Sequence, residues 1–174
     1  MRFLAVLNKD GGTLKTTDLK AFSKQMREHL ASCGHVVDIE IVAGSQVIDA
    51  LARADQSRSA DVVVVAPATA DLLAKMAGGL ASDLASTALL ATDKRVLAAP
   101  AMNVRMWQHA ATQRNIAQVA RDGVLRVGPN EGEMACGEYG PGRMAEPAEI
   151  ADAVARLIGT STLSASPRLA ALKG

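Results

Sequence analysis

Aromatic residues are scarce in this chain: they make up 2% of its 174 residues, with one Trp, one Tyr and two Phe. Base-stacking surfaces and aromatic sugar-binding sites are built from such side chains, so we expect neither. Lys and Arg together number 19 and Asp and Glu 18, which leaves a formal net charge of +1. Nucleic acids and anionic membranes attract clustered basic charge, so neither is an expected partner.

Cysteines and long hydrophobic runs are also few. The two cysteines, Cys33 and Cys136, allow one disulfide at most, and the polar residues that follow the first apolar run argue against a signal peptide. No apolar run reaches the ~18 residues that a membrane-spanning helix needs. We therefore expect a soluble protein in the reducing cytoplasm, with no membrane partner.

What the chain does have is apolar residues, 49% of the total, in alternating patterns. A length of 174 residues, at roughly 150 residues per domain, indicates a single domain over 1–158 and a Ser/Thr-rich linker or tail over 159–174. Strands are expected at 3–7, 35–42, 61–66, 96–99 and 124–127. Helices are expected at 17–31, from Ser45 or Gln46 to Ala54, and at 103–122. The segment 70–90 is expected to form one or two helices, because Gly78 and Gly79 permit a break or a close approach. This alternation predicts an open parallel α/β sandwich.

Ligands of such sheets bind beyond the carboxyl ends of the strands. The third expected strand runs into small residues at 67–70, where helix N-terminal amides can approach a flat or anionic ligand. Asn103 follows the fourth strand directly. Its amide either holds a carboxylate or carbonyl of a ligand or caps the next helix, and both interpretations stay open at this stage.

The sharpest local feature is the segment M-A-C-G-E-Y-G-P-G-R-M at 134–144, which is rich in turn-forming residues around Cys136. A cysteine in such a loop can act as a proton donor or nucleophile, and the alternative is an incidental, partly buried thiol. No second cysteine or histidine lies nearby, so a metal site is not expected.

Three segments resemble the flavin-dependent cysteine decarboxylases. A-P-A-M-N-V-R-M-W at 99–107 is similar to the P-x-M-N-x-x-M-W signature of that family, and A-C-G-E-Y-G-P-G-R-M-A-E-P-A-E-I at 135–150 is similar to its substrate-recognition flap. The run at 60–84, which begins A-D-V-V-V-V-A-P-A-T-A-D, resembles the flavin-binding strand and helix. The resemblance covers about 60–158, and the most similar members decarboxylate 4′-phosphopantothenoylcysteine in coenzyme A biosynthesis.

The resemblance implies a three-layer, flavodoxin-like α/β fold and a homotrimer or dodecamer that binds FMN. It implies that the flavin oxidises the cysteinyl group of the substrate, that the resulting thioaldehyde loses carbon dioxide, and that the reduced flavin returns the electrons. By this resemblance Asn103 holds the substrate carboxylate and Cys136 donates the final proton. The flavin would be lined by Pro67, Ala68, Thr69, Ala70 and Met102. Substrate would contact Asn103, Met106, Ala135 and Gly137.

The first sixty residues depart from this pattern. The family carries a G-S-I-A type loop for the FMN phosphate, where this chain offers only Gly11, Gly12 and Thr13 as a replacement cradle. The family histidine aligns near Arg53, and no His lies between His35 and His109. Residues 1–60 weakly resemble the start of a diacylglycerol-kinase-type lipid kinase, which suggests a chimera. Two functions stay open. The chain is either a decarboxylase, with full or impaired activity, or a non-catalytic flavin-binding or oligomeric scaffold protein.

Overall fold

The structure is a computed structural model that describes residues 2–6, 16–32, 38–41, 61–133 and 137–159. Five parallel strands form the main sheet in the order β2-β1-β3-β4-β5. This is the strand order of flavodoxin-like folds, so the predicted fold class is confirmed. The strands are β1 (Arg2–Val6), β2 (Asp38–Ile41), β3 (Val62–Ala68), β4 (Arg95–Pro100) and β5 (Leu125–Arg126).

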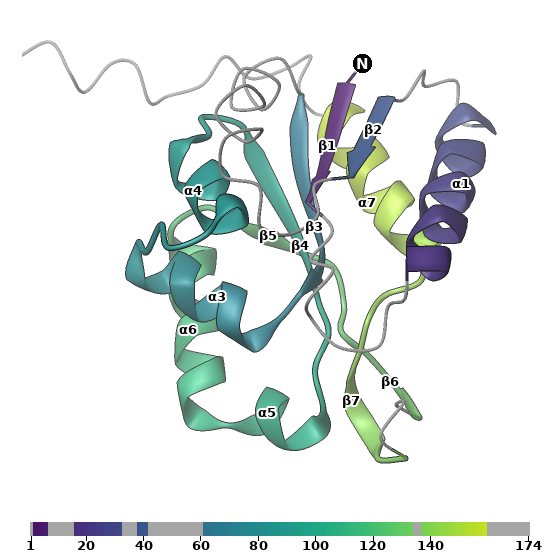
Figure 1. Ribbon diagram of the computed structural model, residues 1–174. Helices are drawn as coiled ribbons and strands as arrows, with labels where there is room; N and C mark the ends of the chain where they lie inside the picture. Colours follow the sequence, from purple (N-terminus) through teal and green to yellow (C-terminus); the bar gives the residue numbers. More distant parts are fainter. Residues whose placement is uncertain (1, 7–15, 33–37, 42–60, 134–136, 160–174) are drawn as a thin grey trace, which may run out of the picture.

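Helices cover both faces of the sheet, which gives three layers (Figure 1). On one face lie α1 (Thr16–Ser32) and α7 (Pro147–Gly159). On the other lie α3 (Ala70–Gly78), α4 (Leu84–Ala91) and α6 (Ala110–Arg121), with the short α5 (Val104–Gln108) leading into α6. None of the helices in the described ranges is long and apolar enough to cross a bilayer.

The valine run of β3 explains why it lies at the centre. Val62 and Val64 belong to the buried cluster under α1 and α7, whereas Val63 and Val65 belong to the cluster under α3 and α6. Alternate side chains of a strand point to opposite faces, so a strand covered on both sides has to be apolar at every position. All seven residues of β3 are buried.

Two of the segments expected to be helical, 70–90 and 103–122, each contain two helices. Of the two alternatives for 70–90, the structure has two helices, since α3 ends at a left-handed Gly79 and α4 begins after Asp83. The single helix expected at 103–122 is instead two, because His109 leaves the helical conformation, ends α5 and caps α6. The helix expected from Ser45 or Gln46 to Ala54 lies outside the described residues.

The segment at 134–144, interpreted as a turn-rich loop, contains the second strand of an antiparallel hairpin. Its strands are β6 (Asn130–Glu133) and β7 (Tyr139–Arg143), and they pair apart from the main sheet. Figure 1 shows this β6–β7 hairpin below the carboxyl ends of the central strands, next to α5. It therefore stands at the edge where an α/β sheet of this kind binds its ligands.

Candidate active site

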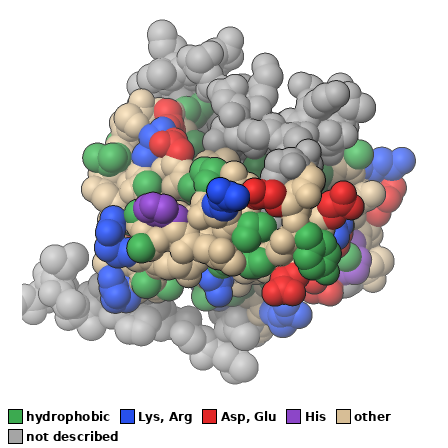
Figure 2. Space-filling model, turned by 90° about the horizontal axis from the view of Figure 1, so that it is seen from below, with side chains coloured by type: hydrophobic (Ala, Val, Ile, Leu, Met, Phe, Trp, Pro, Cys, Tyr) green, Lys and Arg blue, Asp and Glu red, His purple; other side chains and the backbone are tan. Residues whose placement is uncertain are grey.

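The ends of β3 and β4 bring the predicted flavin-lining residues together. Ala68 pairs with Pro100 in the sheet, and the Ala101 amide donates a hydrogen bond of 3.2 Å to the Ala68 carbonyl. The segment 67–70 and Met102 consequently meet at one edge, although 30 residues of chain separate them. Seen from below, that end of the molecule carries hydrophobic, basic and acidic side chains interspersed rather than a field of one charge (Figure 2).

Small side chains surround the start of α3. Ala68 is fully buried, Thr69 and Ala70 are half-buried, and the Thr69 hydroxyl accepts a hydrogen bond of 3.3 Å from the Leu72 amide. A helix N-terminus with no bulky side chain in front of it allows the edge of a flat, polar ring to approach backbone N–H groups. The residues at this strand end therefore fit the FMN that the family resemblance implies.

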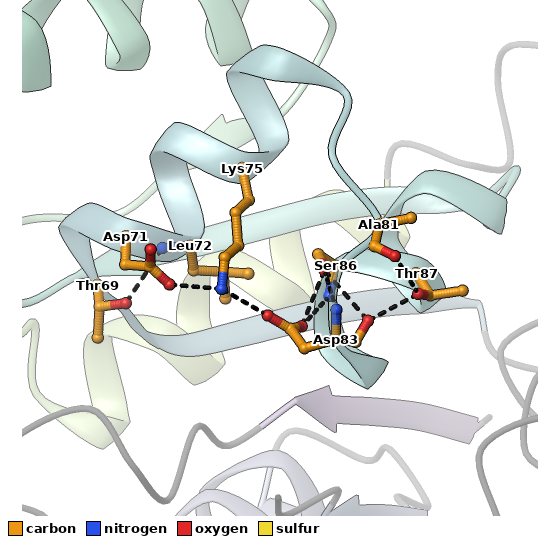
Figure 3. Close-up of polar contacts among 8 residues, drawn as sticks. All are labelled: Thr69, Asp71, Leu72, Lys75, Ala81, Asp83, Ser86 and Thr87. Carbon is orange, nitrogen blue, oxygen red and sulfur yellow. Dashed lines mark hydrogen bonds and ion pairs between the residues drawn. The ribbon is translucent and has the colours of Figure 1, made fainter. Parts of the chain in front are cut away.

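Asp71, in the first turn of α3, is held by a lysine of its own helix. Lys75 Nζ lies 2.7 Å from Asp71 Oδ2 and 2.7 Å from Asp83 Oδ2 (Figure 3). The hydrogen bonds to Asp71 and then Asp83 raise the pKa of Lys75 above its usual range. Partial burial opposes ionisation of Asp83, but hydrogen bonds from Lys75 and Ser86 lower its pKa overall. The acidic side chain at the site is thus paired with a cation.

Asn103 caps α5. Its Oδ1 accepts a hydrogen bond of 2.8 Å from the Met106 amide, and its backbone is extended, as N-cap residues require. The capping interpretation of this residue is therefore confirmed, and it does not exclude the other. The cap uses the oxygen alone, so the two N–H groups on Nδ2 can still serve a carboxylate. Met106 lies on the same short helix with 46% of its surface exposed.

The β6–β7 hairpin is attached to this corner. The Met102 amide donates a hydrogen bond of 3.0 Å to the Gly142 carbonyl, and Arg105 Nε lies 3.5 Å from Glu138 Oε1. Gly140 approaches Val104 so closely that an added Cβ would lie 3.0 Å from Val104 Cγ2. The signature segment at 99–107 and the segment similar to the family flap at 135–150 are therefore in contact, although 27 residues separate them in sequence.

Several predicted site residues fall outside the described part of the chain. These are Gly11, Gly12, Thr13, Ala135 and Cys136, together with Arg53 at the position of the missing histidine. Gly137 is described: its φ is 76°, and a Cβ added there would meet nothing within 4 Å. The assignment of Gly137 to a substrate site stays a prediction.

Sequence reasoning missed the residues that connect these segments. Val104, Gly140 and Gly142 bind the hairpin to α5, and Lys75 balances the acidic side chains of the α3–α4 corner. The alternate glycines at 140 and 142 were the available signal, because spaced glycines in a strand indicate a close approach of another segment.

The model of the family described as Flavoprotein matches residues 10–159. Among curated proteins, the coenzyme A biosynthesis bifunctional protein CoaBC of Vibrio parahaemolyticus is 45% identical over 121 residues, which are 64% of this chain and 30% of that protein. The CoaBC of Escherichia coli strain K12 is 48% identical over 103 residues, 59% of this chain and 25% of that protein. The chain thus spans about a third or less of the length of these relatives.

Solved structures agree in fold. A PPC decarboxylase mutant complexed with pantothenoylaminoethenethiol has a TM-score of 0.69 and 26% identity, with 91% of this chain and 98% of that chain covered. The FMN binding protein AtHal3 has a TM-score of 0.66 and 26% identity, with 95% and 98% covered. The family match begins at residue 10, so these comparisons give no support to a lipid-kinase origin of residues 1–60.

Proposed function

The chain belongs to the Flavoprotein family, and from this premise we propose that it is an FMN-dependent carboxy-lyase that converts 4′-phosphopantothenoylcysteine to 4′-phosphopantetheine in coenzyme A biosynthesis. The observation that carries the proposal is the 45% identity to a coenzyme A biosynthesis protein over 121 residues. The contact of the signature segment with the β6–β7 hairpin supports it, because both segments resemble substrate-handling parts of cysteine decarboxylases.

The roles of the chain's own groups follow from their chemistry. Pro67, Ala68, Thr69, Ala70 and Met102 would line the flavin, and Gly11, Gly12 and Thr13 would hold its phosphate. Bound FMN would supply a two-electron acceptor and donor next to the substrate. The Asn103 Nδ2 group donates hydrogen bonds to the carboxylate that is lost, while Met106, Ala135 and Gly137 shape the substrate site. The Cys136 thiol donates the proton that completes the product, and this role rests on the family resemblance.

The experiment is an absorption spectrum with and without added FMN, followed by incubation with 4′-phosphopantothenoylcysteine and measurement of carbon dioxide and 4′-phosphopantetheine. Flavin bands and both products are expected. Flavin bands without either product would contradict the enzymatic proposal and favour the second candidate, a non-catalytic flavin-binding or scaffold protein. The observation that favours this second candidate is the absence of any His between His35 and His109, since loss of a general base commonly costs about 10²–10⁴-fold in rate.

Assembly and location are further parts of the proposal. We expect a homotrimer or a dodecamer in the cytoplasm, with one domain over 1–158 and a tail over 159–174. The mass of the protein in solution, measured by light scattering at the same time as the flavin spectrum, tests the assembly. A monomer that binds FMN would contradict it.

A further inference from the structure

From Glu138, the residue before β7, to Gly142 within it, every second residue contacts the segment around Asn103, in reverse order along the chain. Glu138 pairs with Arg105 at 3.5 Å, Gly140 lies against Val104, and the Gly142 carbonyl accepts a hydrogen bond of 3.0 Å from the Met102 amide. The residues immediately before and after Asn103 are therefore both held by one strand. An exposed ion pair alone contributes little, so the two glycine contacts carry most of this attachment.

The approach at Gly140 leaves no space for a side chain. A Cβ there would lie 3.0 Å from Val104 Cγ2 and 3.4 Å from Val104 Cγ1, and the residue has a φ of +150°, which side-chain-bearing residues rarely adopt. Val104 therefore fills the position that a side chain at 140 would occupy. The distance between α5 and β7 is set by the two methyl groups of this valine.

Asn103 is fixed from the other side by the helix that it begins. Its Oδ1 accepts from the Met106 amide and its backbone carbonyl accepts from the Trp107 amide at 2.9 Å. Trp107 in turn stacks with Arg126 of β5, whose guanidinium carbon is 5.6 Å from the ring centroid. A displacement of Val104 would tilt this five-residue helix, move the Asn103 amide and change the surroundings of Trp107.

We propose that Val104 is a positioning residue, which through its contact with Gly140 holds the Asn103 amide in register with the β6–β7 hairpin. The inference rests on the proposed function only for the ligand that Asn103 binds. The claim that Val104 fixes the position of α5 relative to β7 does not depend on that function. A valine that merely filled space would affect stability without affecting the orientation of α5.

The test is a double-mutant cycle on the full chain with Val104→Ala, Gly140→Ala and the double variant. Val104→Ala opens a gap, Gly140→Ala creates a steric conflict, and the double variant places a methyl group from residue 140 where the valine methyls were. The effect of the double variant is therefore expected to be smaller than the sum of the effects of the two single variants. Gly79→Ala is the matched control, because Gly79 has a φ of +65° and a Cβ added there meets nothing within 4 Å.

Two readouts separate positioning from packing. Trp107 is the single tryptophan of the chain, so its emission and its quenching by acrylamide report on α5. Each single variant is expected to change both, the double variant to restore them in part, and Gly79→Ala to leave them unchanged. In the decarboxylation assay, Val104→Ala is expected to lower kcat/KM by about 10- to 100-fold.

Additive effects of the two substitutions on Trp107 would overturn the inference, as would a Val104→Ala variant that loses stability but keeps both its Trp107 signal and its kcat/KM. If Gly140→Ala does not fold, Val104→Ala alone decides through the same two signals. A wild-type chain that binds no FMN or releases no carbon dioxide would contradict the proposed function, while the Trp107 measurements would still decide the inference.

Discussion

Asn103 has two tasks that a single substitution can separate. Its oxygen caps α5, and its N–H groups are proposed to bind the substrate carboxylate. Asp retains an oxygen at the N-cap and is favoured there, so Asn103→Asp should leave the unfolding midpoint nearly unchanged while it repels the carboxylate. Asn103→Ala should lose about 1 kcal/mol of stability as well.

Both variants should lower kcat/KM for decarboxylation by about 10- to 100-fold or more, which is the value of a charge-assisted hydrogen bond. Urea unfolding and steady-state kinetics measured on the same preparations check this. Full activity in Asn103→Asp would show that the N–H groups of this residue do not contact the carboxylate.

At the scale of elements, the α3–α4 corner predicts a pH dependence. Because the pKa of Asp83 is lowered in the folded chain, its ionised form stabilises the fold above the usual carboxyl range. That contribution is lost as the pH falls through this range towards the lowered pKa. Asp83→Asn keeps an N-cap oxygen but no charge, so it should cost up to about 1 kcal/mol at neutral pH and flatten the acid side of the stability profile.

Urea unfolding of both proteins at several pH values between neutral and acid measures this difference. Asp93→Asn is the control, since Asp93 is 78% exposed and its ion pair with Lys94 is 3.4 Å long. If the difference in the free energy of unfolding between wild type and Asp83→Asn were the same at every pH, the charge of Asp83 would not be what stabilises this corner.

The elements show where sequence patterns suffice. The uninterrupted valines at 62–65 predicted a buried strand, which is present. The paired glycines at 78 and 79 permitted a helix break without requiring it, and the structure has one there. The break at His109 was not predicted, because the apolar spacing of Met106, Ile116 and Val119 continues across it. The β6–β7 hairpin was missed because its glycines, which permit contact with α5, are also the residues that indicate loops.

Some residues of the candidate site could be predicted from the sequence and others could not. Strand ends and motifs correctly gathered 67–70, Met102 and Asn103 at one edge, since parallel strands share that edge. The contact of Val104 with Gly140 depends on how two segments that are distant in the sequence dock in space. The spaced glycines at 140 and 142 indicate that another segment approaches, but they do not indicate which one, so Val104 could not be identified from the sequence.

At the scale of the whole molecule, the two buried clusters on either face of the sheet carry the stability. Ile150 of α7 is fully buried against β3 and β4, so Ile150→Ala should cost about 2–5 kcal/mol. Leu90 is 60% exposed, and Leu90→Ala should change stability by no more than about 0.5 kcal/mol. Urea unfolding midpoints compare the two, and equal losses would mean that the face under α7 is packed less tightly than the structure shows.

The alternating contacts of β7 also bear on how this segment tolerates change over evolution. Gly140 and Gly142 are held against the neighbouring segment, whereas Tyr139, between Glu138 and Gly140, is 75% exposed. A saturation library of 138–142 selected for function should therefore accept many residues at 139 and few at 140. Substitutions that accumulate in this hairpin should therefore spare position 140, where a smaller residue at 104 would make space for a side chain but the φ of +150° would still favour glycine.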